Sequence, residues 1–289
     1  DASGKTPLHI AARFGDADIV RLLIKHKAMV NTQCASGCTP LHETMVHGPL
    51  MHAVKCNRIL LKNGAHADRK ISGDVTLLHF AATKGDARMV IALINRGAKI
   101  NALAARGVTP LSEASMRGHV EVVEALIMKK ADTNIFSDAG TPLHVAIAHG
   151  HLKVVEILLK NGAKTNLTGP RNTTPLELAV VRGDSQIAQM LLKLPEGNEI
   201  DVNVRVDHGR TLLHQAALQG NLELVKLLTD HGFNVNLQKK VLLPCTMLLS
   251  TLAHSRLSVY CTRVQCITLL PMVKKCLCIL RKMIKLCGF

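Results

Sequence analysis

The chain has 289 residues, of which 47% are hydrophobic and only 2% aromatic, so Leu, Val, Ile and Ala must fill any core, as in packed helices. Its longest charge-free apolar run, residues 241–255, is too short and too polar to span a bilayer, and we predict no transmembrane segment. The formal net charge of +15 suggests an acidic partner.

A motif close to Thr-Pro-Leu-His recurs along most of the chain. A Gly follows the start of each copy after nine residues, and a Leu-rich stretch and an Asn come later. A fixed period of this length indicates a repeat architecture. The copies begin at Thr6, Thr39, Thr76, Thr109, Thr141, Thr174 and Thr211, with gaps of 33, 37, 33, 32, 33 and 37 residues.

Each copy predicts two short helices. In the first copy Thr6 suits a helix N-cap, Pro7 suits the first turn, and Gly15 can take the left-handed conformation that ends the helix. A second helix with an apolar face follows and ends near Lys27. Helices this short cannot bury their apolar faces alone, so the copies must stack on one another.

The gaps also locate three irregularities. Insertions of four residues around 48–52 and 194–198 lengthen the second and sixth copies, and we expect both to form surface loops. One residue is missing before Thr141, which predicts a tighter turn at that point.

This pattern resembles the ankyrin repeat family, over about residues 1–238. The resemblance implies an all-α repeat solenoid of helix-turn-helix units with short β-hairpin tips. It also implies that a recurring histidine, at His9, His42, His79, His144 and His214, bonds the backbone of neighbouring hairpins, and we favour this structural role over a catalytic or metal-binding one. The implied repeats cover about 1–33, 34–70, 71–103, 104–135, 136–168, 169–205 and 206–238.

The resemblance further implies that partners bind along the hairpin tips and the concave face of the first helices. The candidate residues there are Lys5, Arg13, Phe14, Lys84, Arg106, Met116, Arg117, Arg171, Val181, Arg182, Arg210 and Leu218. Because their charges are basic, we expect a protein partner with an acidic or phosphorylated peptide, gripped by charge-assisted bonds along Arg117 and Arg182.

The chain shows no Gly-rich phosphate loop, HExxH or GxSxG sequence, so we predict no enzyme activity and no cofactor. A non-catalytic adaptor or scaffold in the cytoplasm or nucleus is the first interpretation. The alternative is the substrate-recognition part of a larger protein, such as a ubiquitin-ligase receptor, a channel or a kinase. Binding of nucleic acid or anionic lipid through the basic face is less favoured, since aromatics for base stacking are few.

Residues 239–289 break the repeat and become apolar, basic and Cys-rich, with no Asp or Glu from residue 241 onward. In a shifted reading frame, each codon would join the last base of one residue's codon to the first two bases of the next. Such a frame can encode Thr-Pro-Leu-His, starting at the junction of Leu242 and Leu243. We therefore expect an out-of-frame translation of further repeats. A genuine capping or amphipathic, membrane-surface segment is the alternative.

Overall fold

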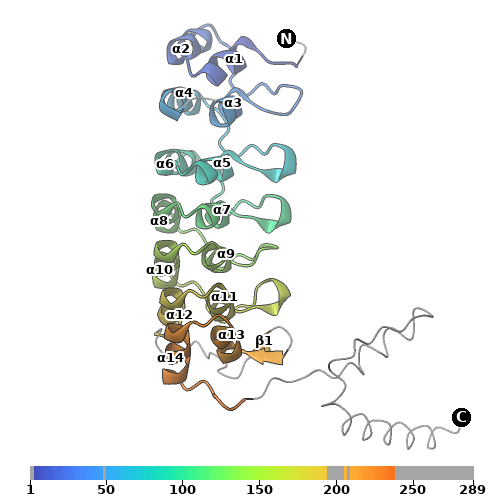
Figure 1. Ribbon diagram of the computed structural model, residues 1–289. Helices are drawn as coiled ribbons and strands as arrows, with labels where there is room; N and C mark the ends of the chain where they lie inside the picture. The colour runs from blue at the N-terminus through green and yellow to red at the C-terminus, as the bar shows by residue number, and fades with distance from the viewer. Residues whose placement is uncertain (1–2, 48–49, 194–204, 207–208, 238–289) are drawn as a thin grey trace, which may run out of the picture. The chain divides into compact units, whose positions relative to one another are not determined.

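The computed structural model describes residues 3–47, 50–193, 205–206 and 209–237, within a compact unit that covers residues 1–240. The helices follow one another in pairs (Figure 1). Their bounds are α1 Pro7–Phe14, α2 Ala17–Lys25, α3 Pro40–His47, α4 Leu50–Lys62, α5 Leu77–Lys84, α6 Ala87–Ile94, α7 Pro110–Arg117, α8 Val120–Met128, α9 Pro142–His149, α10 Leu152–Lys160, α11 Pro175–Arg182, α12 Ser185–Leu192, α13 Leu212–Leu218 and α14 Leu222–Asp230.

The first helix of each pair packs on the first helices of its neighbours, which gives a column from α1 to α13. The second helices form another column beside it, and the hairpins project from the first-helix column on the side away from the second helices (Figure 1). Short 3-10 turns shape three tips, at Ser72–Asp74, Ala105–Gly107 and Pro170–Asn172. Strands β1 (Arg205–Val206) and β2 (Arg210–Thr211) pair antiparallel. The stacked helix pairs confirm the predicted solenoid.

The predicted helix signals act as expected in the first pair. Thr6 is the N-cap of α1, and its backbone N–H donates to Nδ1 of His9 at 3.1 Å. Gly15 ends the helix in the left-handed conformation, with φ 77°. Asp16 then caps α2 by accepting hydrogen bonds from two backbone N–H groups.

The core runs along the stack because each repeat contributes the same apolar positions. The Leu of the tetrad is fully buried in five first helices, at Leu8, Leu41, Leu78, Leu111 and Leu143. Burying one such side chain stabilises the fold by about 1.5–3 kcal/mol. The core is therefore continuous across repeats rather than closed within one of them.

Two of the five tetrad histidines, His9 and His79, join neighbouring repeats as predicted, and Nε2 of His42 donates to the Arg69 carbonyl at 3.3 Å. Nε2 of His9 donates to the carbonyl of Cys38 at 3.1 Å, and Nε2 of His79 donates to that of Val108 at 3.0 Å. A carbonyl can only accept, so Nε2 carries the proton and Nδ1 accepts from the N-cap. Nε2 of His144 is buried and makes no such hydrogen bond, so the prediction is wrong for that histidine.

The prediction of a surface loop at 48–52 is wrong for residues 50–52, while 48–49 lie outside the described residues. Helix α4 begins at Leu50 and has 13 residues, against nine in α10. The inserted residues include Leu50 and Met51, which favour helix, so they add a turn to α4. The insertion at 194–198 and residues 239–289 also lie outside the described residues.

The tighter tip before Thr141 is confirmed. The N–H of Ser137 donates to the carbonyl of Gly140 at 3.0 Å, only three residues on, whereas Ala104 reaches Val108, four residues on. This hairpin also projects less than its neighbours beside α7 and α11 (Figure 1).

Candidate functional site

The ends of the first helices carry several of the predicted partner-binding residues. Arg13, Lys84 and Arg117 are exposed there, and Met116 is half-buried. The apolar side chains vary in exposure along the column, with Phe14 at 71%, Val181 at 51% and Leu218 at 64%. The structure therefore aligns a mixed basic and apolar surface at these helix ends.

A ladder of hydrogen bonds crosses the same region. In four successive repeats, the carbonyl two residues before the helix-ending glycine accepts a side-chain donor from the next repeat. These bonds are His119 to Thr83 at 3.0 Å, His151 to Met116 at 3.0 Å, Arg182 to Ala148 at 2.6 Å and Gln219 to Val181 at 2.7 Å. The ladder satisfies carbonyls that a helix end leaves without an intrahelical partner.

Which side chain donates each ladder hydrogen bond depends on the residue after the helix-ending glycine of the donor's own repeat. His119 and His151 occupy that position and donate directly. In the sixth repeat the position is Asp184, which cannot donate when ionised and instead accepts from the N–H of Ile187 to cap α12. Arg182, two residues earlier, supplies the missing donor.

Two predicted binding residues are therefore engaged within the chain. Arg182 donates to the Ala148 carbonyl, so its guanidinium is directed along the stack. Lys5 lies 2.9 Å from Oε1 of Glu43, whose side chain is only 3% exposed. A buried carboxylate without its cation would destabilise the fold, so Lys5 has a structural role.

The tips hold the other predicted arginines. Arg106 and Arg171 are exposed, and both have left-handed backbones, with φ 63° and φ 58°. Gly73 occupies the same tip position in the third repeat, with φ 77°. Arg210 lies in β2 and is half-buried.

Two exposed apolar side chains near these tips are not among the predicted binding residues. Leu103 and Phe136 are 47% and 52% exposed, and each stands two residues after the Asn that follows the Leu-rich stretch. Other repeats have Gln33, Lys70 and Thr168 at this position, so the change from polar to apolar was visible in the sequence.

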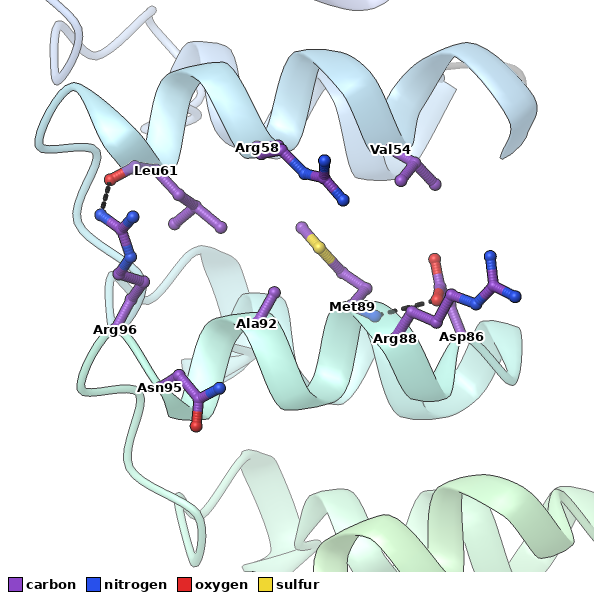
Figure 2. A pocket seen from close by; sticks show the side chains of 9 residues that line it. All are labelled: Val54, Arg58, Leu61, Asp86, Arg88, Met89, Ala92, Asn95 and Arg96. Atoms are coloured by element: carbon purple, nitrogen blue, oxygen red, sulfur yellow. Dashed lines mark hydrogen bonds between the residues drawn. The ribbon is translucent and has the colours of Figure 1, made fainter.

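A groove of about 270 Å³ separates α4 from α6 (Figure 2). Leu61 and Met89 form part of its apolar lining, Arg58 points into it, and Arg96 donates to the Leu61 carbonyl at one end. Asp86 accepts from the N–H of Met89 and so caps α6. The groove offers positive charge above apolar side chains but no pair of groups suited to acid–base catalysis.

The buried histidines are neutral groups with hydrogen-bonded partners at the N-caps. Burial lowers the pKa of His42, His79 and His144, so these rings are neutral at neutral pH, as their hydrogen bonds require. Within the described ranges, no three His, Cys, Asp or Glu side chains gather into a metal-binding group. No helix in that same part of the chain combines the length and apolarity needed to cross a membrane.

Comparison with known proteins agrees with this architecture. The family model described as "Ankyrin repeats (3 copies)" matches residues 1–71, 78–169 and 164–239. The crystal structure of the human ASB11 ankyrin repeat domain has a TM-score of 0.65 and 28% identity, and the match covers 78% of this chain and 98% of that domain.

Two curated relatives match shorter segments. The chain is 32% identical over 132 residues, 46% of its length, to potassium channel AKT2/3 of Arabidopsis thaliana. It is also 32% identical over 136 residues, 47% of its length, to neurogenic locus notch homolog protein 1 of Xenopus laevis. These segments are 16% and 5% of the two relatives, so the chain spans only a small part of either protein.

Ankyrin repeats generally mediate protein–protein interactions, and their fold is typically a non-catalytic interaction module. The family match extends over most of residues 1–239, and the helix pairs stack with hairpins on one side. The chain belongs to the ankyrin repeat family.

Proposed function

We propose that the chain is a non-catalytic adaptor or scaffold that holds an acidic or phosphorylated segment of a protein partner. The observation that carries this proposal is the left-handed backbone conformation of Arg106 and Arg171 at the exposed tips. A left-handed conformation costs a residue with a side chain about 1–2 kcal/mol, and Gly73 avoids this cost at the same position. Strained residues cluster at binding sites, which supports a role in binding for both arginines.

The hairpin between these two tips completes the surface. It is the short Ser137–Gly140 turn, and the N–H of Asp138 donates to the carbonyl of Arg106 at 3.0 Å. Phe136 stands exposed at its base. Guanidinium groups bind carboxylates and phosphates through paired hydrogen bonds, so a partner segment with acidic groups beside an apolar side chain suits this surface.

The exposed Arg13, Lys84 and Arg117 extend the positive charge along the helix ends. Lys5 and Arg182 contribute less, because each is already paired within the chain. The free thiols at Cys34, Cys38 and Cys56 support a cytoplasmic or nuclear setting. We therefore centre the proposed contact on the tips of the fourth to sixth repeats, residues 104–173.

A peptide array tests the proposal directly. Each peptide should be present in phosphorylated, acidic and amide-substituted forms, and the chain should bind the first two forms selectively. Replacing Arg106 and Arg171 with Gly should weaken that binding about twofold to tenfold per arginine, since one hydrogen bond contributes about 0.5–1.5 kcal/mol.

The matched control is Arg21→Gln with Lys25→Gln, which removes the same charge from the exposed face of α2. It should leave peptide binding unchanged. Equal losses in the two double variants, together with a steep salt dependence, would instead indicate non-specific attraction of the kind that also draws nucleic acid or anionic lipid.

A second candidate is the recognition part of a larger protein. The matched segments form a small part of both curated relatives, one of which is by its name a potassium channel. Under this candidate the same tip surface binds a substrate or a regulatory segment, and the function of the whole protein resides elsewhere. Transcript sequencing on both sides of the coding region would reveal any attached domain.

A further inference from the structure

The hairpin tip of the second repeat contains two cysteines in the sequence Cys34-Ala-Ser-Gly-Cys38. The N–H of Cys34 donates to the carbonyl of Cys38 at 2.9 Å, and the N–H of Gly37 donates to the carbonyl of Cys34, also at 2.9 Å. Gly37 has φ 77°, so the tip is a three-residue loop that ends in a left-handed glycine. The two cysteines therefore face each other as the first pair of the hairpin.

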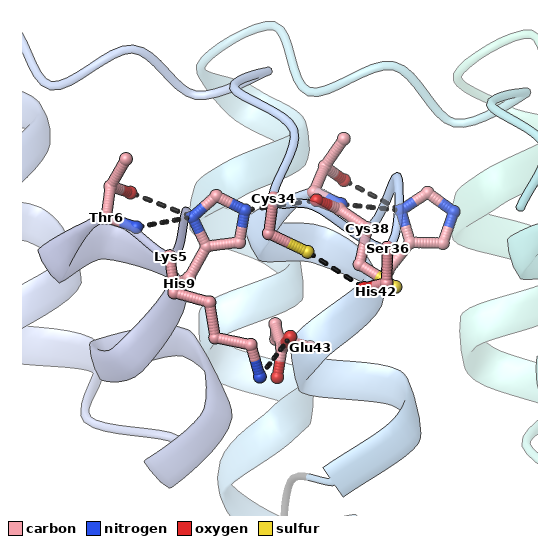
Figure 3. A network of polar contacts seen from close by, with 9 residues as sticks. Lys5, Thr6, His9, Cys34, Ser36, Cys38, His42 and Glu43 are labelled. Atoms are coloured by element: carbon pink, nitrogen blue, oxygen red, sulfur yellow. Dashed lines mark hydrogen bonds and ion pairs between the residues drawn. The ribbon is translucent and has the colours of Figure 1, made fainter. Parts of the chain in front are cut away.

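This pairing sets a separation that a disulfide can bridge. Hydrogen-bonded residues on opposite strands have Cα atoms about 5.5 Å apart, and disulfides occur with Cα atoms about 4.4–6.8 Å apart. Sγ of Cys34 lies 3.0 Å from Oγ of Ser36. Figure 3 shows this sulfur turned toward Ser36, with Cys38 on the opposite arm of the hairpin.

We propose that Cys34 and Cys38 are a reversible oxidation site, which a small-molecule disulfide such as oxidised glutathione converts to a disulfide across the hairpin tip. Cys38 is half-buried and Cys34 is buried, so the reagent reaches Cys38 first. Cys56 is fully buried on α4 and lies outside this pair.

The reaction balances with oxidised glutathione alone. The thiolate of Cys38 attacks one sulfur of the reagent, whose S–S bond breaks, and the departing glutathione thiolate takes up the proton that Cys38 lost. The thiolate of Cys34 then attacks Sγ of Cys38, forms the protein disulfide and expels the second glutathione thiolate, which takes up the other proton. Two protein thiols are oxidised as one glutathione disulfide is reduced to two thiols.

The greater exposure of Cys38 places it first, and the surroundings of the two thiols favour Cys34 for the closing step. Burial raises the pKa of Cys34, but hydrogen bonds from the Ser36 hydroxyl and from the backbone of Ser36 and Cys38 bring it below the ordinary value of 9.0. The pKa of Cys38 is raised, by burial and by the neighbouring Cys34 thiol and Glu43 carboxylate, although the Ser36 hydroxyl lowers it. Cys34 is thus the better nucleophile for the closing step.

Oxidation would act on a junction between repeats. The carbonyl of Cys38 accepts from Nε2 of His9, and the N–H of Ala35 donates to the carbonyl of Ser3 at 2.9 Å (Figure 3 shows the His9 contact). A bond between the two arms of the hairpin would fix the tip that holds these contacts. A disulfide that closes so short a loop is strained, and strained disulfides are the readily reduced, regulatory kind.

Peptide mapping of the full chain after equilibration with mixtures of oxidised and reduced glutathione tests the proposal. The peptide that contains Cys34 and Cys38 should lose two hydrogen atoms, resist alkylation and recover both thiols as reduced glutathione is added. Cys56 should stay reduced in the same samples.

The variant Cys34→Ser should instead accumulate a stable mixed disulfide between Cys38 and glutathione, because the closing thiolate is absent. Circular dichroism before oxidation checks that the variant is folded, and the wild-type mapping stands on its own if it is not. Two products from the wild-type chain would overturn the proposal: glutathione adducts alone, or dimers linked by disulfides through these cysteines. Thiols that stay unreacted under conditions that fully oxidise a simple dithiol would overturn it too.

Discussion

Replacing Arg182 with alanine removes the guanidinium that donates to the Ala148 carbonyl at 2.6 Å. One such hydrogen bond contributes about 0.5–1.5 kcal/mol, and a cation beside the C-terminus of α9 adds about 0.3–1 kcal/mol. We expect Arg182→Ala to lower the free energy of unfolding by about 1–2 kcal/mol. The loss should fall on the junction between the fifth and sixth repeats.

The chain itself supplies the control. Gln219 stands one residue before its glycine, as Arg182 does, and donates through a neutral amide to the corresponding carbonyl at 2.7 Å. Arg182→Gln should therefore keep the hydrogen bond and lose only the charge, with a cost below about 1 kcal/mol. Comparison of the two variants separates the bond from the charge.

Urea unfolding followed by circular dichroism measures both variants, with the slope against urea checked for each, because a weakened junction can make a repeat array unfold in stages. Equal stability of Arg182→Ala and the wild type would refute the structural assignment. The same variants should bind the acidic peptides selected by the array almost as well as the wild type. A loss of binding as large as that expected for Arg106→Gly would show that Arg182 contacts the partner.

Three further predictions concern the fold and the tail. A Cβ on Gly118 would lie 2.5 Å from the His151 ring, whereas Gly64 has nothing within 4 Å and a similar left-handed backbone, so urea titration should show Gly118→Ala to be about 0.5–1.5 kcal/mol more destabilising than Gly64→Ala. Burial lowers the pKa of His79 below 6.5, so the unfolded chain binds more protons below that pH. The free energy of unfolding should fall as the pH drops through 6.5 toward the folded pKa, and less steeply in His79→Ser, which copies the fourth repeat. Beyond about residue 240, the coding DNA read in the shifted frame should contain another Thr-Pro-Leu-His, and stop codons in that frame would contradict the out-of-frame hypothesis.

The sequence was sufficient for the fold because the signals that specify it are local and recur. A threonine N-cap precedes the first helices, a proline opens five of them, and a glycine follows each at a fixed spacing. The role of the tetrad histidine came from the resemblance to the ankyrin repeat family. The prediction of a surface loop at 48–52 was wrong because it assumed that inserted residues between two helices form a loop. Helix propensity decided instead, and α4 gained a turn.

The candidate site was harder to predict because its members depend on two repeats at once. Arg117 and Arg182 hold the same position in their repeats, yet Arg182 is directed to a carbonyl because Asp184 follows its glycine, where His119 follows the other. The role of Arg182 thus depends on Asp184 in its own repeat and on the Ala148 carbonyl in the preceding repeat. Comparing repeats one position at a time does not distinguish Arg182 from Arg117.

We expect substitutions in the ladder and substitutions in the tips to have different effects. Substitutions at ladder donors should change stability, since each donor satisfies a carbonyl of the preceding repeat. Replacing Arg106 or Arg171 with glycine should instead preserve or raise the free energy of unfolding, because glycine removes a cost of about 1 kcal/mol for the left-handed backbone. The same replacement should weaken binding. If Arg106→Gly left the stability unchanged or higher and the selected peptides bound as before, the tips would have no binding role, and the partner would have to contact the helix ends alone.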